Sequence, residues 1–534
     1  MASTTALALA LAVRVSIALI TRTFFQPDEY FQALEPAHFF VFGYGDLTWE
    51  WTSKPPIRSI LYPALNVPIY WVLKILNLDQ TSLLVAAPKV MHGLLAAGTD
   101  IWVREVARKT LGQRYVPATF FLSLTSFFHA LSLSRSMSNS LEATLTTAAL
   151  GYYPWDATIL PTRSQLRKFL VFIALACSIR VTNAITWVFL FPPLLWQLRR
   201  NSALLRVFVT DTLATICVTL SLLFTFDSMY SGAPTLTPLN FLRVNASSVS
   251  LFYGSAPWHY YLVQALPLLA GPALPFVLHG AYLALTQGPR PLKLLLHTVI
   301  WTGAVFSFAG HKEWRFLHPL VPAMHILAAR SLVSLYDRAS PPCSSKPASS
   351  LGIKRTHASV LALLSLVPAL YAALWHSSAQ IGVLSHLRGL PDTELRSIGF
   401  LMPCHSTPAQ SHLHRRIPVW RLSCEPPLHG EELSTYQDET DIFFRDPVAF
   451  LSAHFPDQVD TTFPPSARAP HEYAWPTHLV LFGALLRERG VEDALRAKGY
   501  TEAWRAGNGI EEDPRRREGV RIWRRGVAAD KISI

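Results

Sequence analysis

Long apolar runs recur along this 534-residue chain, and no other feature of the sequence constrains its fold as strongly. A helix needs about 20 consecutive apolar residues to cross a bilayer. Only 15% of the residues are charged, whereas an average soluble domain has about 25%. The mean hydropathy of +0.26 agrees with this deficit of charge. The sequence therefore predicts a mainly α-helical, polytopic membrane protein.

Apolar segments that qualify as transmembrane helices number about eleven. They lie at about 4–21, 84–105, 115–133, 138–153, 168–180, 184–197, 203–225, 262–285, 291–309, 314–335 and 357–376. Several are shorter than about 20 residues, so the two segments between 168 and 197 are the least well defined. The first segment lacks a basic leader and is interrupted by Arg14, so we expect an uncleaved span.

Basic residues gather in short clusters between the apolar segments. With a cytoplasmic N-terminus, the alternation of spans places the basic loops Arg104–Arg114, Arg163–Lys168, Arg199–Arg206, Arg290–Lys293 and Asp337–Arg355 in the cytoplasm. This distribution satisfies the positive-inside rule. The formal net charge of +12 is therefore explained by membrane topology, and we expect no nucleic-acid partner.

The same alternation collects polar residues on the opposite, lumenal side. Four stretches fall there, Ser134–Glu142, Ile179–Asn183, Phe226–Tyr261 and Gly310–Phe316, together with a long first loop at 22–83. Polar groups at membrane depth are functional by default. We therefore predict that these stretches form one lumenal site.

Acidic and aromatic residues are concentrated in the first lumenal loop. Asp28 and Glu29 follow the first span directly, and such a pair could take a proton from a substrate hydroxyl as a general base. A solvated acid or a helix cap is the structural alternative. Trp49, Glu50 and Trp51 would suit a sugar, although aromatic residues also populate membrane interfaces without any ligand.

Cationic residues that could hold a phosphate occur in three other lumenal stretches. His311, Lys312, Glu313 and Arg315 lie at the mouth of a span; Arg135 is predicted to share a helix face with Asn139 and Glu142; and Arg180 precedes Asn183. Arginine binds phosphate with two parallel hydrogen bonds. Snorkelling to lipid headgroups and internal pairing are the structural alternatives.

Two regions complete the predicted organisation. Residues 1–376 should form the membrane region, with an interfacial helix within Pro55–Leu76 and a Ser/Pro linker at Ala339–Ser350. Residues 377–534 should form a soluble lumenal domain, and its segment Arg487–Arg525 is helix-prone. Cys404 and Cys424 could form a disulfide there. His405, His412 and His414 match no zinc spacing, so we expect no metal site. Asn245 begins a glycosylation sequon.

Five stretches together carry a resemblance: FQPDEYFQALEPAH, FGYGDLTWEW, PPIRSILYP, HKEWRF and FLMPCHSTP. The chain resembles the dolichyl-phosphate-mannose-dependent mannosyltransferases of the endoplasmic reticulum, and most specifically those that add the third mannose to the glycosylphosphatidylinositol (GPI) precursor. The similarity runs from Phe25 to about Phe482. It departs from the expected pattern at Val181, Ala256 and Ala409, and these positions bear on the fit of the acceptor.

The resemblance implies a GT-C fold, a lumenal site, and transfer through an α1,2 linkage by a single inverting displacement. It implies Asp28 and Glu29 as the catalytic pair, and His311, Lys312 and Arg315 on the donor phosphate; from their positions we expect Arg135 and Arg180 to bind the same phosphate. The acceptor residues would be Glu35, Trp49, Glu50, Trp51, Tyr253, Trp258 and His259.

The implied partners are dolichyl phosphate mannose, a GPI intermediate bearing two mannoses and the membrane lipids. We expect a monomer that needs no cofactor. The alternatives are a sister mannosyltransferase of the N-glycan precursor pathway, a lipid transporter or scramblase, and a non-catalytic subunit. A transporter would require internal repeats and polar groups at the bilayer midplane, whereas here the polar stretches share one side.

Overall fold

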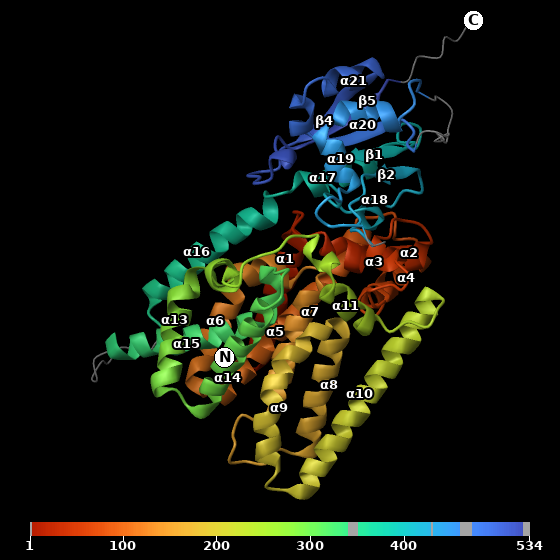
Figure 1. Cartoon of the computed structure of the whole chain (residues 1–534). Helices are drawn as coiled ribbons and strands as arrows, with labels where there is room; N and C mark the ends of the chain where they lie inside the picture. The colour runs from red at the N-terminus through yellow and green to blue at the C-terminus, as the bar shows by residue number, and fades with distance from the viewer. Residues whose placement is uncertain (1–2, 340–350, 429–430, 460–471, 527–534) are drawn as a thin grey trace, which may run out of the picture. The chain divides into compact units, whose positions relative to one another are not determined.

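The computed structural model describes residues 3–339, 351–428, 431–459 and 472–526, which are mainly helical (Figure 1). Contacts within the chain divide it into two compact units. Unit 1 comprises Met1–Ile20, Glu50–Val72 and Ala86–Tyr371, and unit 2 comprises Thr21–Trp49, Leu73–Val85 and Ala372–Ile534. The predicted linker lies outside the described residues from position 340 onward. The predicted division of the chain at residue 376 stays a prediction.

The helices of unit 1 follow the apolar segments of the sequence. They are α1 (Ser3–Ile20), α5 (Leu83–Thr110), α6 (Val116–Thr125), α7 (Ser138–Tyr152), α8 (Arg163–Ile179), α9 (Ala184–Leu198), α10 (Ser202–Ser231), α11 (Thr237–Ala246), α12 (Leu266–Ala270), α13 (Leu274–Gln287), α14 (Arg290–Ser307), α15 (Val321–Ala339) and α16 (Arg355–Leu374). Short 3-10 or π-helical segments precede several of them, including His129–Leu133, Val181–Asn183, Tyr261–Ala265 and Trp314–Leu320.

Five helical segments within the described residues are long and apolar enough to cross a membrane. They are Val181–Leu198, Ser202–Ser231, Tyr261–Gln287, Trp314–Arg338 and Arg355–Gly389, and a shorter apolar helix runs from Thr4 to Ile20. The polytopic, helical character predicted from the sequence is therefore confirmed. The number of about eleven crossings stays a prediction.

The long helix α10 shows how unit 1 meets lipid. Its 30 residues span about 45 Å at 1.5 Å per residue. Asp211 and Asp227 lie within it, and every residue between them is uncharged. Leu213, Val218 and Leu222 are all about half exposed. An exposed apolar helix surface of this length suits the hydrocarbon core of a bilayer.

The interior of unit 1 is closely packed around α13 and α15. A Cβ atom at Gly280 would overlap the backbone of Leu327 on the facing helix, so this crossing requires glycine. Large aromatic residues fill the space around α8 and α9, where Phe169 and Trp187 meet edge to face at 5.6 Å. The same core contains Phe128.

A charged group in α1 is also part of this interior. Arg14 and Asp100 are both fully buried, and two hydrogen bonds of 2.7 and 2.8 Å join the guanidinium to the carboxylate. Ser123 donates a third bond of 2.7 Å to Asp100 and accepts one from Arg14 through its carbonyl oxygen. The arginine that interrupts the first apolar run therefore faces protein.

Unit 2 contains a five-stranded mixed sheet that the sequence did not predict. Its strands are β1 (Ile398–Leu401), β2 (Val419–Arg421), β3 (His478–Phe482), β4 (Tyr500–Ala506) and β5 (Val520–Arg525). Their order is β2-β1-β3-β5-β4. The β1 strand pairs in parallel with β2 and β3, and β5 pairs antiparallel with β3 and β4.

Both faces of the central strand β3 are buried. Along β3, Leu479 and Leu481 pack into one apolar cluster, and Val480 and Phe482 pack into another on the opposite face. The helices of unit 2 are α2 (Glu35–Phe42), α17 (Ala379–Gly389), α18 (Gln410–Leu413), α19 (Glu439–Arg445), α20 (Pro447–His454) and α21 (Val491–Ala497). Residues of α17 belong to one cluster, and residues of α19, α20 and α21 belong to the other.

One local prediction was wrong. The segment Arg487–Arg525 is helical only in a 3-10 turn, in α21 and in a second short turn, and its remainder carries β4 and β5. The segment Pro55–Leu76 contains the expected helix, α4 (Val67–Ile75), after a 3-10 turn at Pro63–Leu65, and its interfacial position stays a prediction. Prolines interrupt the backbone hydrogen bonding that a continuous helix would need. A four-residue helix, α3 (Trp49–Thr52), precedes this segment.

Candidate active site

The segment His311–Phe316 holds two cations in unit 1. Lys312 and Arg315 are each only 8% exposed. The Lys312 Nζ atom donates a hydrogen bond of 2.7 Å to the carbonyl oxygen of Ala256 and another to that of Ala309. Arg315 donates from Nε and Nη2 to the two carboxylate oxygens of Glu313, at 2.5 and 2.7 Å. Both cationic groups are therefore fixed in position.

Glu313 stays ionised in spite of its burial. Burial favours the neutral acid, but Arg315 and a hydrogen bond with His311 outweigh it and hold the pKa of Glu313 well below its usual range. His311 lies 3.1 Å from the same carboxylate, and this hydrogen bond raises the pKa of the imidazole. The carboxylate therefore orients Arg315 at any pH near neutrality.

Residues from the other polar stretches of unit 1 lie close to this segment. Asn139 donates a hydrogen bond of 3.2 Å to the carbonyl oxygen of Arg315. The Arg180 guanidinium lies 5.4 Å above the ring of Phe316. The fourth stretch also takes part, because the Nδ1 atom of His311 is 2.9 Å from the carbonyl oxygen of Gly254.

Arg180 is bound in turn by α7. Its Nε atom lies 3.2 Å from Glu142, and Nη1 donates to Ser138 at 3.2 Å. Asn183 donates to Glu142 at 2.9 Å. Arg135, by contrast, precedes α7 in a turn and bonds the carbonyl oxygen of Leu131, so its predicted place on one helix face with Asn139 and Glu142 was wrong.

Four cations, Arg135, Arg180, Lys312 and Arg315, lie in this part of unit 1, and Arg135, Lys312 and Arg315 are buried. Arg180 and Arg315 pair with Glu142 and Glu313. Buried positive charge on rigid supports suits a phosphate group.

A small cavity beside Arg180 adds a cation that the sequence argument did not single out. It encloses about 50 Å³ and is lined by Ile57–Ser59, Cys177–Thr182, Thr237, Pro238 and Phe241. Arg58 in this lining pairs with Glu50 at 2.7 Å. Asp227 fixes the neighbouring backbone by accepting bonds from Ser59 and from the Ile60 N–H. The motif PPIRSILYP was the available signal for Arg58.

The acidic pair lies in unit 2, in the first helical turn after Pro27. Asp28 is partly exposed, whereas Glu29 is only 6% exposed. A π-helical segment, Tyr30–Leu34, and helix α2 continue from this turn. The accessible member of the pair is therefore Asp28.

A loop of unit 2, residues 404–414, holds the helix that follows the acidic pair. His405 packs on Phe31 with ring centroids 4.5 Å apart. Glu35 is 2% exposed and accepts hydrogen bonds from the Ala409 N–H at 2.9 Å and from the Ser411 hydroxyl at 2.5 Å. Burial raises the pKa of Glu35, and these bonds oppose the shift. This placement favours a structural role for Glu35 over the predicted acceptor contact.

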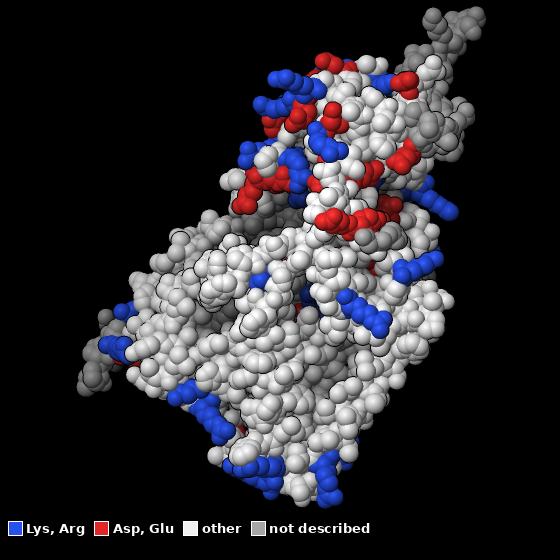
Figure 2. Space-filling view, in the orientation of Figure 1, with Lys and Arg blue, Asp and Glu red and all other residues white. Residues whose placement is uncertain are grey.

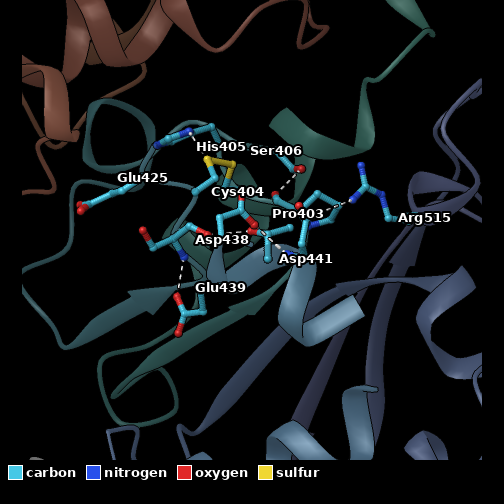
Figure 3. Close-up of a disulfide and its surroundings, with 12 residues drawn as sticks. Pro403, Cys404, His405, Ser406, Glu425, Asp438, Glu439, Asp441 and Arg515 are labelled. Atoms are coloured by element: carbon cyan, nitrogen blue, oxygen red, sulfur yellow. Dashed lines mark hydrogen bonds and ion pairs between the residues drawn. A yellow bond between two sulfur atoms is a disulfide. The ribbon is translucent and has the colours of Figure 1, made fainter. Parts of the chain in front are cut away.

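A disulfide fixes one end of this loop. Cys404 and Cys424 are joined, and the His405 Nδ1 atom lies 3.4 Å from the Cys424 sulfur (Figure 3). Burial lowers the pKa of His405 to about 4, with a further contribution from Arg421 and an opposing one from Asp28. Among the described residues, the one cluster spaced for a metal consists of these two cysteines and His405, and the disulfide engages both sulfur atoms.

Two further histidines tie the loop to other parts of unit 2. The His38 Nε2 atom lies 2.8 Å from His414 Nδ1, and His414 Nε2 lies 2.9 Å from the Asp79 carboxylate. Burial and the neighbouring His414 lower the pKa of His38 to about 3. The chain of rings thus joins α2, the segment around Asp79 and the end of α18.

The remaining predicted acceptor residues differ in their exposure to solvent. Trp49 and Trp51 are buried, so neither offers the open face that a stacked sugar needs. Tyr253 and Trp258 are 49% and 69% exposed, and the Trp258 ring meets that of His259 edge to face. Asn245 is exposed in α11, and its side chain bonds the carbonyl oxygen of Phe241.

The chain's apolar helices and buried cationic cluster belong to a fold of the GT-C glycosyltransferase class. The structure is similar to that of ArnT from Cupriavidus metallidurans bound to undecaprenyl phosphate, with a TM-score of 0.57 and 14% sequence identity over 98% of both chains. The apo structure of the same ArnT gives a TM-score of 0.56 over 97% of both chains, at 13% identity.

The chain belongs to the Alg9-like mannosyltransferase family, whose pattern matches residues 5–414. It is 36% identical to GPI mannosyltransferase 3 of Yarrowia lipolytica, over 96% of both chains. It is 35% identical to GPI alpha-1,2-mannosyltransferase 3 of Mus musculus, over 92% of this chain and 84% of the relative. For the Homo sapiens protein of that name the identity is 35%, over 90% and 79%. The predicted resemblance is confirmed, and the chain is a mannosyltransferase.

Proposed function

We propose that this chain transfers the third mannose of the GPI precursor, through an α1,2 linkage, from dolichyl phosphate mannose in the endoplasmic reticulum membrane. Similarity over 96% of both chains to a relative named GPI mannosyltransferase 3 carries this proposal. The buried cations Lys312 and Arg315 support it, because the donor is a lipid phosphate ester.

The acceptor hydroxyl attacks the donor sugar in one inverting displacement. A β-linked mannosyl phosphate becomes an α-mannoside, so the configuration at the anomeric carbon changes once. Such a step needs one base for the attacking hydroxyl. We assign this role to Asp28, because it is more exposed than the buried Glu29. Glu29 would position the helical turn that carries Asp28.

The leaving phosphate needs charge stabilisation and no general acid. Lys312 and Arg315 would supply it, since preorganised cations stabilise developing negative charge most strongly when they are shielded from water. Glu313 keeps Arg315 in a fixed orientation through two hydrogen bonds. Arg180 and Arg135 would add positive charge, and His311 would contact the same group. We expect the reaction to proceed without a divalent cation, and transfer in the presence of EDTA tests this.

The acceptor would be a GPI intermediate that bears two mannoses, bound on the lumenal side by a monomeric enzyme. Tyr253 and Trp258 are the exposed aromatic residues suited to sugar contact. Trp51 and Glu50 would have an indirect role, because they would support the loop that carries Arg58.

Transfer assays in microsomes from a strain depleted of the endogenous enzyme test the proposed function. Labelled dolichyl phosphate mannose is supplied with a dimannosyl GPI acceptor or with an N-glycan lipid precursor. We expect a trimannosyl GPI product, cleavable by an α1,2-specific mannosidase. Extension of the N-glycan precursor alone would identify the sister enzyme and overturn the proposal. The variant Arg315→Gln should abolish transfer, and the matched control Arg200→Gln, on an exposed turn, should retain it.

A further inference from the structure

The first three turns of α8 carry a surface hollow that the transfer reaction does not use. It has a volume of about 340 Å³ and is lined by Arg163, Ser164, Arg167, Lys168, Val171 and Phe172. These residues form two neighbouring rows on the helix, spaced four residues apart within each row. The hollow is therefore a furrow that runs along α8, between one row ending at Val171 and another ending at Phe172.

The polarity of the furrow changes along its length. Arginine and lysine side chains line its beginning, where the Arg163 and Arg167 side chains are 54% and 53% exposed. Eight residues later, about 12 Å along the axis, Val171 is 51% exposed. A furrow with a cationic beginning and an exposed apolar end matches a phospholipid, whose charged headgroup continues into acyl chains.

Aromatic residues of three helices border the furrow. Phe172 stacks on Tyr152 with ring centroids 5.6 Å apart, and Trp102 lies 4.9 Å from Tyr152. The Lys168 Nζ atom is 5.6 Å from the centre of the Tyr152 ring. Clustered tyrosine and tryptophan mark the headgroup level of membrane proteins. This cluster thus places the cationic part of the furrow at the membrane–water interface.

The furrow retains positive charge after its internal pairing. Helix α10 packs on α8 and contributes Asp211, whose carboxylate lies 2.8 Å from Arg167 and 3.4 Å from Arg163. One carboxylate therefore serves two arginines, and with Lys168 the set has a net charge of +2. Figure 2 shows further blue side chains at the end of unit 1 where α9 leads into α10, below a broad uncharged surface.

We propose that the furrow formed by Arg163, Arg167, Lys168, Val171 and Phe172 binds one acidic phospholipid. The cations hold the phosphate and the additional negative charge of the headgroup, with the two arginines suited to bidentate contact. An acyl chain lies along Val171 and Phe172. Asp211 competes with the headgroup for the arginines. By the predicted topology the furrow lies on the cytoplasmic side, opposite the reaction.

Lipid binding by the purified full-length protein tests the proposal. Fluorescent phosphatidylinositol is titrated into the protein in neutral micelles, with fluorescent phosphatidylcholine as the reference lipid. We expect saturable binding of phosphatidylinositol that weakens at high salt, and little binding of phosphatidylcholine. Each cation near a membrane surface strengthens acidic-lipid binding roughly fivefold, so Arg163→Gln with Lys168→Gln should weaken it about 25-fold. Mannose transfer in neutral micelles should be unchanged and reports correct folding.

Two further variants distinguish the furrow from general attraction to positive charge. Arg199→Gln with Arg200→Gln removes the same charge from the turn between α9 and α10 and should leave binding within about twofold of wild type. Asp211→Asn should strengthen binding, because it removes the competing carboxylate. Equal losses in the two double variants, or weaker binding in Asp211→Asn, would overturn the proposal. Displacement by millimolar inorganic phosphate would equally overturn it, because the site would then recognise phosphate without its lipid.

Discussion

Removal of the Asp100 carboxylate should destabilise unit 1 more than removal of one partner from any exposed ion pair would. Arg14 and Asp100 are fully buried, and the carboxylate accepts three hydrogen bonds of 2.7, 2.8 and 2.7 Å. In the variant Asp100→Ala the guanidinium keeps its charge but loses its counterion in a region that excludes water. Breaking a buried pair in this way costs about 3–5 kcal/mol.

The paired replacement should behave differently. Arg14→Met with Asp100→Leu removes both charges and fills the space with apolar atoms, so the free energy of unfolding should lie close to that of wild type or above it by about 1–4 kcal/mol. The control Glu105→Ala breaks the partly exposed pair between Arg108 and Glu105 on the same helix as Asp100. That change should cost at most about 1 kcal/mol, because solvent screens exposed charges.

Unfolding of the full-length protein in mixed detergent micelles provides the assay, with helix content and tryptophan fluorescence as probes. The expected order of stability places wild type and the paired variant together, the Glu105 control slightly below, and Asp100→Ala far below. The reasoning would be refuted if Asp100→Ala were as stable as the control. A paired variant less stable than Asp100→Ala would refute it equally.

Three other perturbations have definite expected results. Glu35→Ala leaves buried N–H groups of the 409–411 turn without their acceptor and should lower the free energy of unfolding of unit 2 by about 1–3 kcal/mol; an unchanged denaturation midpoint would contradict this. Replacing Cys404 and Cys424 by serine removes a disulfide between positions 20 apart and should lower the free energy of unfolding by about 3 kcal/mol in the same assay. A loss below about 1 kcal/mol would show that the loop is stable without the disulfide. The folded-state pKa of Glu313 lies below its ordinary value of 4.5, so its contribution to stability is present above pH 4.5 and is lost as the pH falls. The difference in thermal midpoint between wild type and Glu313→Gln should therefore shrink below pH 4.5. A difference that stays constant would contradict a lowered pKa for Glu313.

The helical membrane region could be predicted because hydropathy acts on whole segments. Each apolar run of unit 1 contains helix, and the basic loops fixed an order in which His311–Phe316 and Arg180 fall on one side. Their contact through Phe316 agrees with that order. Membrane topology restricts which segments can meet, so short polar stretches far apart in sequence could be grouped by the side of the membrane on which they fall.

The sheet of unit 2 was missed for a local reason. The strand β4 carries Glu502 and Arg505 with several exposed neighbours, so its alternation of buried and exposed residues is weak. Arginine and glutamate favour helices by propensity, and strand propensity depends mostly on packing against neighbouring strands. The pairing of β4 with β5 supplies that packing, and the sequence alone does not reveal it.

Side-chain partners were the least predictable part of the site. Glu35 was predicted to contact the acceptor sugar, but its carboxylate binds the backbone N–H of Ala409, 374 positions away. Arg14 likewise finds Asp100 and Ser123 in other helices. Asp28 and Glu29 could not be ranked from the sequence; in the structure Asp28 is partly exposed and Glu29 is buried.

The assignment of Asp28 as the base is the central claim, and mannose transfer by two carboxylate variants tests it most directly. Asp28→Asn and Glu29→Gln are assayed at matched expression, with labelled donor and the dimannosyl acceptor. Loss of a general base lowers turnover by about 10²–10⁴-fold, so Asp28→Asn should lose that much kcat with little change in the KM for donor. Glu29→Gln should lose far less. Full activity of Asp28→Asn, or a larger loss in Glu29→Gln, would contradict the account.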